Sequence, residues 1–301
     1  VDALELKGKK LGRVEVEAVN RGGRAGGVGL VDTGVREWRL NKLTITNPDA
    51  QLSATGNWLA LGTQGASNGT GRSPRRTALN FHLDIADAGQ LLARFGMPGV
   101  VRRGKGQMAG QVNWVGSPLA LDTATLGGQF NLAVESGQFL KADPGLAKLL
   151  GVLNLQALPR RLALDFRDVF SEGFAFDSVR GDVRVDLGRA TTNNLQMKGV
   201  NAAVMMEGSA DIARETQDLK VLVVPEINAG TASLVAAVIN PAIGLGTFLA
   251  QWFLQRPLSE AATQQFHIDG TWADPKITKV PHKMFGTKVE AQAPTKQELT
   301  P

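Results

Sequence analysis

Cysteine and tyrosine are both missing from this chain of 301 residues, and only three histidines occur in it. Without cysteine, the chain has neither a disulfide framework nor a thiolate site for a metal ion. Aromatic residues make up 6% of the sequence, whereas a porin-like barrel needs aromatic girdles at both membrane interfaces. These absences argue against a disulfide scaffold, a thiolate metal centre and a porin-like barrel.

The net charge is only +5, and the arginines that produce it lie in short clusters beside glycine and proline. The clusters are Arg72 with Arg75 and Arg76, Arg102 with Arg103, and Arg160 with Arg161. A nucleic-acid groove would combine such charges with exposed aromatic residues or place them along one helix. We therefore predict solvated turns and no nucleic-acid partner, with a weak attraction to anionic lipid headgroups as the alternative.

Motifs that support catalysis are also missing. His82, His267 and His282 are isolated in the sequence, with no second histidine or carboxylate at the spacing of a metal site. No Gly-x-Ser-x-Gly elbow occurs. The glycine-rich stretches 22–29 and 104–106 lack the strand-to-helix setting and the Lys-Ser/Thr ending of a phosphate loop.

Carboxylates on the strands remain as the one other source of acid–base chemistry. Asp165, Asp168, Asp177, Asp182 and Asp186 alternate with apolar residues, so they are expected to face water as a solubilising row. A catalytic pair among them is the alternative. The sequence therefore predicts no catalytic residue, no metal ion, no cofactor and no enzyme.

Most of the chain alternates apolar and polar residues, which is typical of strands with one apolar face. Residues 11–19 show the pattern clearly, with Val14 and Val16 between Arg13, Glu15 and Glu17. Strands are predicted at 11–19, 38–45, 51–61, 81–85, 106–115, 119–125, 128–135, 162–167, 174–176, 183–187, 195–198, 202–207, 209–213, 219–224 and 265–272. Turns are predicted at 47–49 and 274–275, and an exposed loop at 62–76.

Two short helices interrupt the strands. Asp87 is a candidate N-cap for a helix that ends at Phe95, with Gly96 closing it. A second helix is predicted to open at Asp143 and Pro144, with an apolar stripe that reaches Leu153.

Residues 228–255 form the longest uncharged stretch, and its polar and small residues recur at helical spacing. Asn240 followed by Pro241 predicts two helices or one kinked helix. Three settings remain open for this stretch: a membrane span, a core helix, or a helix pair that caps a groove.

A weak internal repeat predicts how the strands are arranged. Residues 110–118 and 269–275 both contain a strand that ends in tryptophan and then a proline turn, and 56–58 resembles a third copy. Repeated hairpins of this kind favour one long antiparallel sheet. The few short helices cannot cover its apolar face, and an uncovered apolar face predicts binding of apolar cargo.

The domain organisation is expected to be simple. Residues 1–279 form one β region that includes 228–255, and the proline-, lysine- and glutamine-rich residues 280–301 form a disordered tail. The chain begins with Val1 and without a targeting segment, so we expect a fragment of a longer protein.

Several blocks in a fixed order resemble the C-terminal region of the AsmA-like proteins and, among them, the large YhdP type. These blocks are 150–162, 164–170, 173–177 and 208–212, with 87–92, 95–96, 104–110 and 114–118 upstream and 270–275 near the end. The resemblance covers roughly residues 30–280.

What this resemblance implies is a bridge-like lipid carrier of the Gram-negative envelope. Such a protein is anchored in the inner membrane by an N-terminal helix and crosses the periplasm as a long, twisted, open hydrophobic β groove. It passes phospholipids toward the outer membrane, so its partners would be phospholipids, a membrane surface at the C-terminal end and envelope proteins.

Two groups of candidate residues follow from this picture. The lipid-lining candidates are Leu162, Leu164, Phe166, Phe174, Phe176, Val183, Val185 and Leu187. The candidates for a membrane-facing or groove-capping helix are Leu234, Val238, Phe248, Trp252 and Phe253. In the alternative interpretation, both groups simply pack on each other as core.

Two other classes of protein remain open at this point. One is a structural or regulatory envelope protein that binds assembly partners through the edge of its sheet. The other is a secreted β-solenoid, which the uneven spacing of the turns disfavours.

Overall fold

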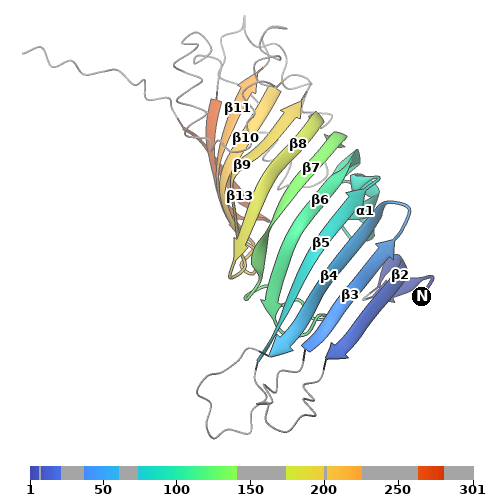
Figure 1. Ribbon diagram of the computed structural model, residues 1–301. Helices are drawn as coiled ribbons and strands as arrows, with labels where there is room; N and C mark the ends of the chain where they lie inside the picture. The colour runs from blue at the N-terminus through green and yellow to red at the C-terminus, as the bar shows by residue number, and fades with distance from the viewer. Residues whose placement is uncertain are drawn as a thin grey trace, which may run out of the picture.

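A single antiparallel sheet makes up nearly all of the described structure (Figure 1). The computed structural model describes residues 1–6, 8–21, 37–60, 74–140, 174–199, 202–225 and 264–280. Their strands form one 13-stranded sheet in chain order, in which each strand pairs with its sequence neighbours. The strands are β1 (Leu4–Leu6), β2 (Lys9–Arg21), β3 (Glu37–Thr46), β4 (Ala50–Ala60), β5 (Arg75–Ile85), β6 (Val101–Val115), β7 (Gly127–Phe139), β8 (Phe174–Asp186), β9 (Arg189–Gly199), β10 (Ala202–Asp211), β11 (Thr216–Pro225), β12 (Gln264–Thr271) and β13 (Pro275–Val280).

This arrangement confirms the predicted mainly β fold with one long, open antiparallel sheet. The alternation of apolar and polar residues located most strands, including β2, β3 and β4, to within a few residues. The predicted strands 202–207 and 209–213 are one strand, β10, which carries an irregularity between Met206 and Gly208 in its pairing with β9.

The predicted strand at 119–125 is wrong. These residues form turns and bends between β6 and β7, because local side chains hydrogen-bond the backbone there. Asp122 accepts hydrogen bonds from the Ala124 N–H and the Thr125 hydroxyl, and Ser117 Oγ accepts one from the Leu119 N–H. Such contacts compete with a strand ladder, although the sequence itself alternates.

Two strands at the ends of the sheet were missed by the sequence patterns. β1 is only three residues long, which is too short for alternation to be informative. β13 follows directly on the predicted turn at Asp274 and Pro275, and it pairs with β12 over Pro275–Val280. The expectation that β12 would be the last strand is therefore wrong.

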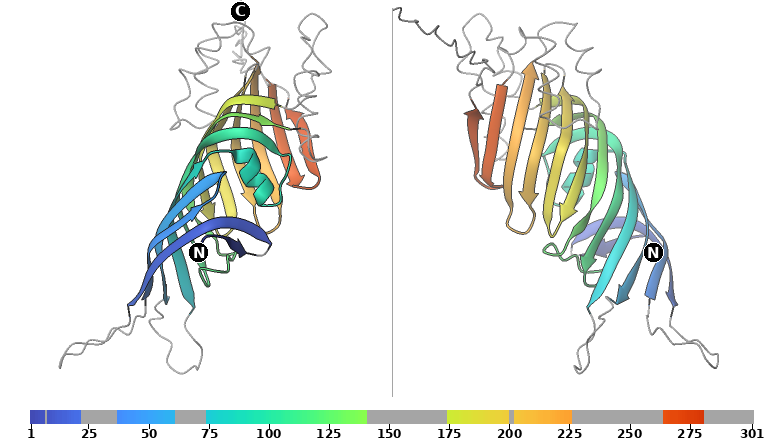
Figure 2. Two further views of the ribbon diagram at one scale, coloured as in Figure 1. Left: turned by 90° about the vertical axis from the view of Figure 1, so that its right-hand side faces the viewer. Right: turned by 60° about the vertical axis from the view of Figure 1, so that its left-hand side comes forward.

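The sheet is strongly twisted and curled, and the single described helix lies within its hollow (Figure 2). We call the face that carries the helix the inner face and the opposite one the outer face. Side chains alternate between the two along each strand. Among described residues, the inner face holds a buried apolar cluster that includes Val134, Phe174, Phe176, Phe266 and Ile268.

Helix α1 (Ala88–Arg94) confirms the helix predicted from Asp87 to Phe95. The Asp87 side chain caps it by accepting a hydrogen bond from the Gln90 N–H at 2.9 Å. Ala88 and Leu91 pack against the apolar cluster of the inner face. A Cβ on Gly89 would lie 2.4 Å from the Val101 carbonyl oxygen, so glycine permits the helix to lie directly on β6.

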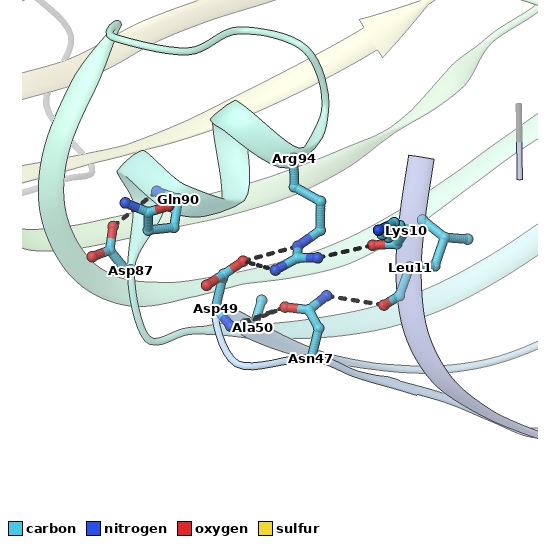
Figure 3. A network of polar contacts seen from close by, with 8 residues as sticks. All are labelled: Lys10, Leu11, Asn47, Asp49, Ala50, Asp87, Gln90 and Arg94. Carbon is cyan, nitrogen blue, oxygen red and sulfur yellow. Dashed lines mark hydrogen bonds and ion pairs between the residues drawn. The ribbon is translucent and has the colours of Figure 1, made fainter. Parts of the chain in front are cut away.

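A polar network fixes the far end of α1 to the turn between β3 and β4 (Figure 3). Arg94 donates hydrogen bonds from Nε and Nη2 to Asp49 Oδ2, and from Nη1 to the Lys10 carbonyl. The Asp49 carbonyl accepts hydrogen bonds from the Ala86 and Asp87 N–H groups. The network therefore joins β2, the β3–β4 turn and α1 at one end of the hollow.

Removing the guanidinium should destabilise the fold measurably. The Asp49 side chain is only 11% exposed, so Arg94→Gln leaves a largely buried carboxylate without its cation. We expect a loss of about 2 kcal/mol in the free energy of unfolding, measured by urea denaturation. The control is Arg102→Gln on an exposed position of β6, which should change stability by less than about 0.5 kcal/mol. Equal effects of the two changes would contradict the assigned role of the network.

Some predictions concern residues outside the described part of the chain. These are the second helix at 143–153, the strand at 162–167, the hydrophobic helices at 228–255 and the tail predicted at 280–301, of which only Val280 is described, as the last residue of β13. None of the described helical residues forms a segment with the length and hydropathy that a membrane crossing requires.

Candidate functional site: the inner face of the sheet

The inner face is apolar across many consecutive strands, and the strand register shows how its residues line up. One row of directly paired residues crosses seven strands, from β2 to β8. We call it the middle row, and it consists of Val16, Leu43, Ala54, Phe81, Gly110, Phe130 and Val183. With strands about 4.8 Å apart, the row is roughly 30 Å long. It carries no polar side chain.

The same pattern continues on either side of the middle row. Leu52, Leu83, Met108 and Leu132 form a parallel row across β4 to β7. Val179, Met197, Val204 and Val223 extend the apolar face from β8 to β11. Many of these side chains are half-buried, and Val16 is 59% exposed. The inner face is therefore an apolar surface that solvent or a ligand can still reach in part.

The outer face carries the charges that the sequence placed between the apolar residues. Cross-strand ion pairs join Glu15 to Lys42 at 3.0 Å and Glu135 to Arg180 at 2.6 Å. The hydrogen bond and charge of Lys42 lower the pKa of Glu15 below its usual value. These pairs are solvent-exposed, so they contribute solubility and register more than stability. The two faces therefore differ sharply in chemistry.

Glycines on the inner face allow the sheet to curl around it. A Cβ on Gly106 would lie 2.0 Å from the Ala133 carbonyl oxygen of β7. A Cβ on Gly110 would lie 2.2 Å from the Gln129 carbonyl oxygen, also of β7. Such contacts arise where adjacent strands tilt toward each other on the concave side, so only glycine fits. The glycine positions therefore help to set the curvature of the hollow.

The two long edges of the sheet differ. We call one edge the helix rim, because α1 joins β5 and β6 there. The strand ends on this edge are Ile85, Val101, Phe139, Phe174 and Ala202. The opposite edge, the turn rim, carries the connections after β6, β8, β10 and β12. Backbone hydrogen bonds link each of these connections to the next. The Gly188 N–H donates to the Leu126 carbonyl, the Ile212 N–H to the Gly188 carbonyl, and the Trp272 N–H to the Glu215 carbonyl.

The structure places the candidate lipid-lining residues of β8 in three different settings. Phe174 and Phe176 are 3% and 4% exposed, and Val185 is also buried. Val183 is half-buried and belongs to the middle row. Leu187 is 74% exposed in the turn after β8 and therefore lies off the inner face. The remaining candidates lie outside the described residues. They are the lipid-lining candidates Leu162, Leu164 and Phe166 and the capping candidates Leu234, Val238, Phe248, Trp252 and Phe253.

Phe174 and Phe176 lie close against glycines of neighbouring strands. A Cβ on Gly137 would be 2.3 Å from Cζ of Phe176, and one on Gly199 would be 2.3 Å from Cζ of Phe174. The Phe176 ring also packs against Phe139, with centroids 5.1 Å apart. Each ring therefore covers a backbone that has no side chain of its own.

Most of the inner face was not among the candidates taken from the sequence. The alternation located β2 to β7 as strands, but the lipid-lining candidates all lie at 162–187. The signal was present, since Phe81 and Leu83 alternate with His82 and Asp84. Which apolar residues share one continuous row depends on strand register, which the sequence does not display.

Titratable groups on the outer face form small clusters. His82 Nε2 lies 3.0 Å from Asp84 Oδ1, and His267 Nε2 lies 3.7 Å from Asp218 Oδ1 and 3.5 Å from Asp269 Oδ2. Pairing between β11 and β12 creates the second cluster, which sequence spacing did not reveal. Within the described ranges, no group of three or more His, Asp or Glu side chains is placed to hold a metal ion.

A hollow of about 580 Å³ lies over β6 to β9. It is lined by outer-face positions, including Gln129, Asn131 and Arg184, and also by Gly110, Phe130 and Val183 of the middle row. Its lining is therefore mixed in polarity, whereas the middle row itself carries only apolar side chains.

Comparison with known proteins agrees with this architecture. The chain is 29% identical over 275 residues to the intermembrane phospholipid transporter YhdP of Escherichia coli (strain K12). The match covers 91% of this chain but 20% of that relative, so the chain spans about a fifth of its length. No solved structure matches the chain. The family model described as YhdP protein matches residues 1–277, and the chain therefore belongs to the YhdP protein family.

Proposed function

We propose that this chain is part of a lipid-transfer conduit, in which phospholipid acyl chains lie on the inner face of the sheet. The observation that carries the proposal is the middle row, an unbroken path across seven strands in which no side chain is polar or charged. The family relationship to a phospholipid transporter supports the same function.

The physical basis is the hydrophobic effect acting on an open surface. Each methylene that leaves water for the inner face contributes about 0.8 kcal/mol. The headgroup would remain at a rim in water, so its desolvation cost is avoided. Neighbouring apolar rows offer similar environments, which permits an acyl chain to move along the sheet without a deep energy minimum.

The setting that we propose is the periplasm of a Gram-negative bacterium. There the full-length protein would be anchored in the inner membrane, with its C-terminal end directed to the outer membrane. Leu162, Leu164 and Phe166 remain candidates for further lining, and residues 228–255 for a helix pair that closes the conduit or meets the membrane.

The proposal is tested by placing charges on one face or the other. Val16→Asp combined with Phe81→Asp puts two carboxylates in the middle row on β2 and β5. Because hydrocarbon does not solvate carboxylate, we expect co-purifying phospholipid to fall about tenfold or more. Lipid would be measured by native mass spectrometry and by phosphorus content per protein after purification from a Gram-negative host.

The matched control uses the same strands and the same charge. Val19→Asp combined with Asn80→Asp places both carboxylates on the outer face, where the Val19 side chain is 40% exposed. This variant should retain its lipid, and circular dichroism should show that both variants are folded. Equal lipid content in both would contradict an inner-face path. A folded, lipid-free parent protein would instead favour partner binding at the sheet edge.

A further inference from the structure

The outer face changes character across the sheet. One row of directly paired outer-face residues crosses nine strands, from β4 to β12, and we call it the outer row. From β4 to β8 its side chains are exposed or half-buried. On β9, β10 and β11 they are 6%, 5% and 0% exposed. The outer row consists of Gln51, Asp84, Gln107, Ala133, Arg180, Gln196, Met205, Leu222 and Gln265.

Strands β10 and β11 are buried on both faces. Ala203 and Val224 pair beside the outer row on the same face, and they are 5% and 4% exposed. Val204 and Val223, on the inner face of the same strands, are 4% and 8% exposed. The sequence is apolar without interruption at 202–206 and 221–224, which is typical of strands that are covered on both faces. We call the buried outer-face residues the outer patch: Gln196, Ala203, Met205, Leu222 and Val224.

The described elements account for burial on the inner face but not for burial of the outer patch. The described neighbours of β10 and β11 are β9 and β12, which lie beside them in the same sheet. The described helix, α1, lies on the inner face (Figure 2). Adjacent strands alone do not bury an outer-face side chain, because Ala133 is only half-buried between Gln107 and Arg180. The outer patch therefore requires a further covering layer.

The position of one segment suits this role. Three long segments outside the described ranges begin at the helix rim, namely 141–173, 226–263 and 281–301. β11 ends at Pro225, next to Val224 of the outer patch, and β12 begins at Gln264, which pairs with Val223. Both ends of 226–263 therefore adjoin the outer patch. Residues 141–173 instead leave the sheet after β7 and return at β8, two strands away from β10.

The composition of the same segment also suits it. Residues 227–255 carry no charged side chain, and neither does the outer patch. Residues 141–173 and 281–301 both contain lysine together with acidic residues. Burial of a charge without a partner is costly, so an uncharged surface favours the uncharged segment.

We propose that the outer patch is the docking surface for residues 226–263, which lie against the outer face of β10 and β11. Apolar side chains of the segment, such as Leu234 and Phe248, would bury the patch through the hydrophobic effect. The segment would then support the sheet from behind and leave the inner face of these strands open. This inference goes beyond the proposed function and does not depend on it.

Photo-methionine tests the proposal without changing the sequence, because methionines lie on both faces. Met205 belongs to the outer patch, Met206 packs against the apolar cluster of the inner face, and Met97 is 48% exposed. The 301-residue chain would be illuminated, and peptide mapping by mass spectrometry would identify what each diazirine has joined. We expect crosslinks from position 205 to 226–263, and about tenfold less quenching by water there than at position 97.

Four results would overturn the proposal. Crosslinks from position 205 to 141–173 or 281–301 would assign the outer patch to another segment. Crosslinks to 226–263 from position 206 but not from 205 would place the segment over the inner face. Crosslinks from position 205 that reach only β9 and β11 would leave the segment elsewhere. Equal quenching by water at 205 and 97 would show that the patch is open.

Thiol reactivity provides a second measurement, because the chain has no cysteine of its own. We expect Met205→Cys to react with maleimide about 100-fold more slowly than Gln107→Cys, its control on the exposed part of the outer row. Adding Leu234→Asp and Phe248→Asp should largely remove this protection, and a rate that stays slow would contradict the proposal.

Val204→Cys in the same background distinguishes undocking of the segment from unfolding of β10. It lies on the inner face and should stay protected when Met205→Cys becomes reactive. If both thiols react, the substitutions have unfolded the strand, and the photo-crosslinks decide the question. Neither measurement involves lipid, so its result is independent of the proposed function.

Discussion

Gly106→Val should destabilise the protein by roughly 3 kcal/mol or more. The new Cβ would lie 2.0 Å from the Ala133 carbonyl oxygen and 2.7 Å from the Val134 Cα, both in the backbone of β7. No side-chain rotation can relieve a clash with backbone, so β6 and β7 must separate or the sheet must flatten. Urea unfolding followed by circular dichroism measures the loss.

The control is Gln107→Val, which places the same side chain on the next residue of β6. Gln107 is exposed on the outer face, where a β-branched residue is well accommodated in a strand. Its effect should stay within about 0.5 kcal/mol. If both variants were equally stable, the curl of the sheet would not depend on glycine at the inner face.

Phe176→Ala should cost about 3–5 kcal/mol, the usual range for deleting a buried phenylalanine. The side chain is 4% exposed and packs against Phe139 and over Gly137. For the same reason, an aspartate at this position is expected to unfold the protein rather than only to displace lipid. Thermal and urea unfolding of the alanine variant measure the loss.

A double-mutant cycle with Gly137 separates packing over the glycine from burial alone. Gly137→Ala in the parent protein brings a methyl group to 2.3 Å from the Phe176 ring and should be destabilising. In the Phe176→Ala background the ring is absent, so the same change should cost little. We expect an interaction energy of about 1 kcal/mol or more, and additive effects would show that the ring does not lie on Gly137.

These two predictions also bear on function, because they separate residues that hold the sheet from residues that could meet a ligand. Phe174 and Phe176 belong to the first kind, since they are buried against neighbouring strands. Val16 and Phe81 belong to the second kind, since solvent still reaches them on the inner face. The lipid test therefore uses the latter pair.

Local chemistry in the sequence predicted a large part of the fold. Alternation around Val14 and Val16 marked β2, and Asp87 with Gly96 marked the ends of the region that contains α1. The resemblance in ordered blocks identified the family, which the match over residues 1–277 confirms. Alternation failed at 119–125, because the Asp122 carboxylate accepts hydrogen bonds from Ala124 and Thr125 and so stabilises a turn. A period-two pattern cannot distinguish such a turn from a strand.

What the sequence by itself determined was the class of structure: strands with one apolar and one charged face, joined in order. The tertiary structure alone decided which apolar residues stand in one row, which are buried by a neighbouring strand, and where the outer row changes from exposed to buried. The physical reason is that these relations depend on strand register and on the curl of the sheet. Both arise from contacts between residues far apart in the chain, whereas alternation records only which face of its own strand a residue occupies.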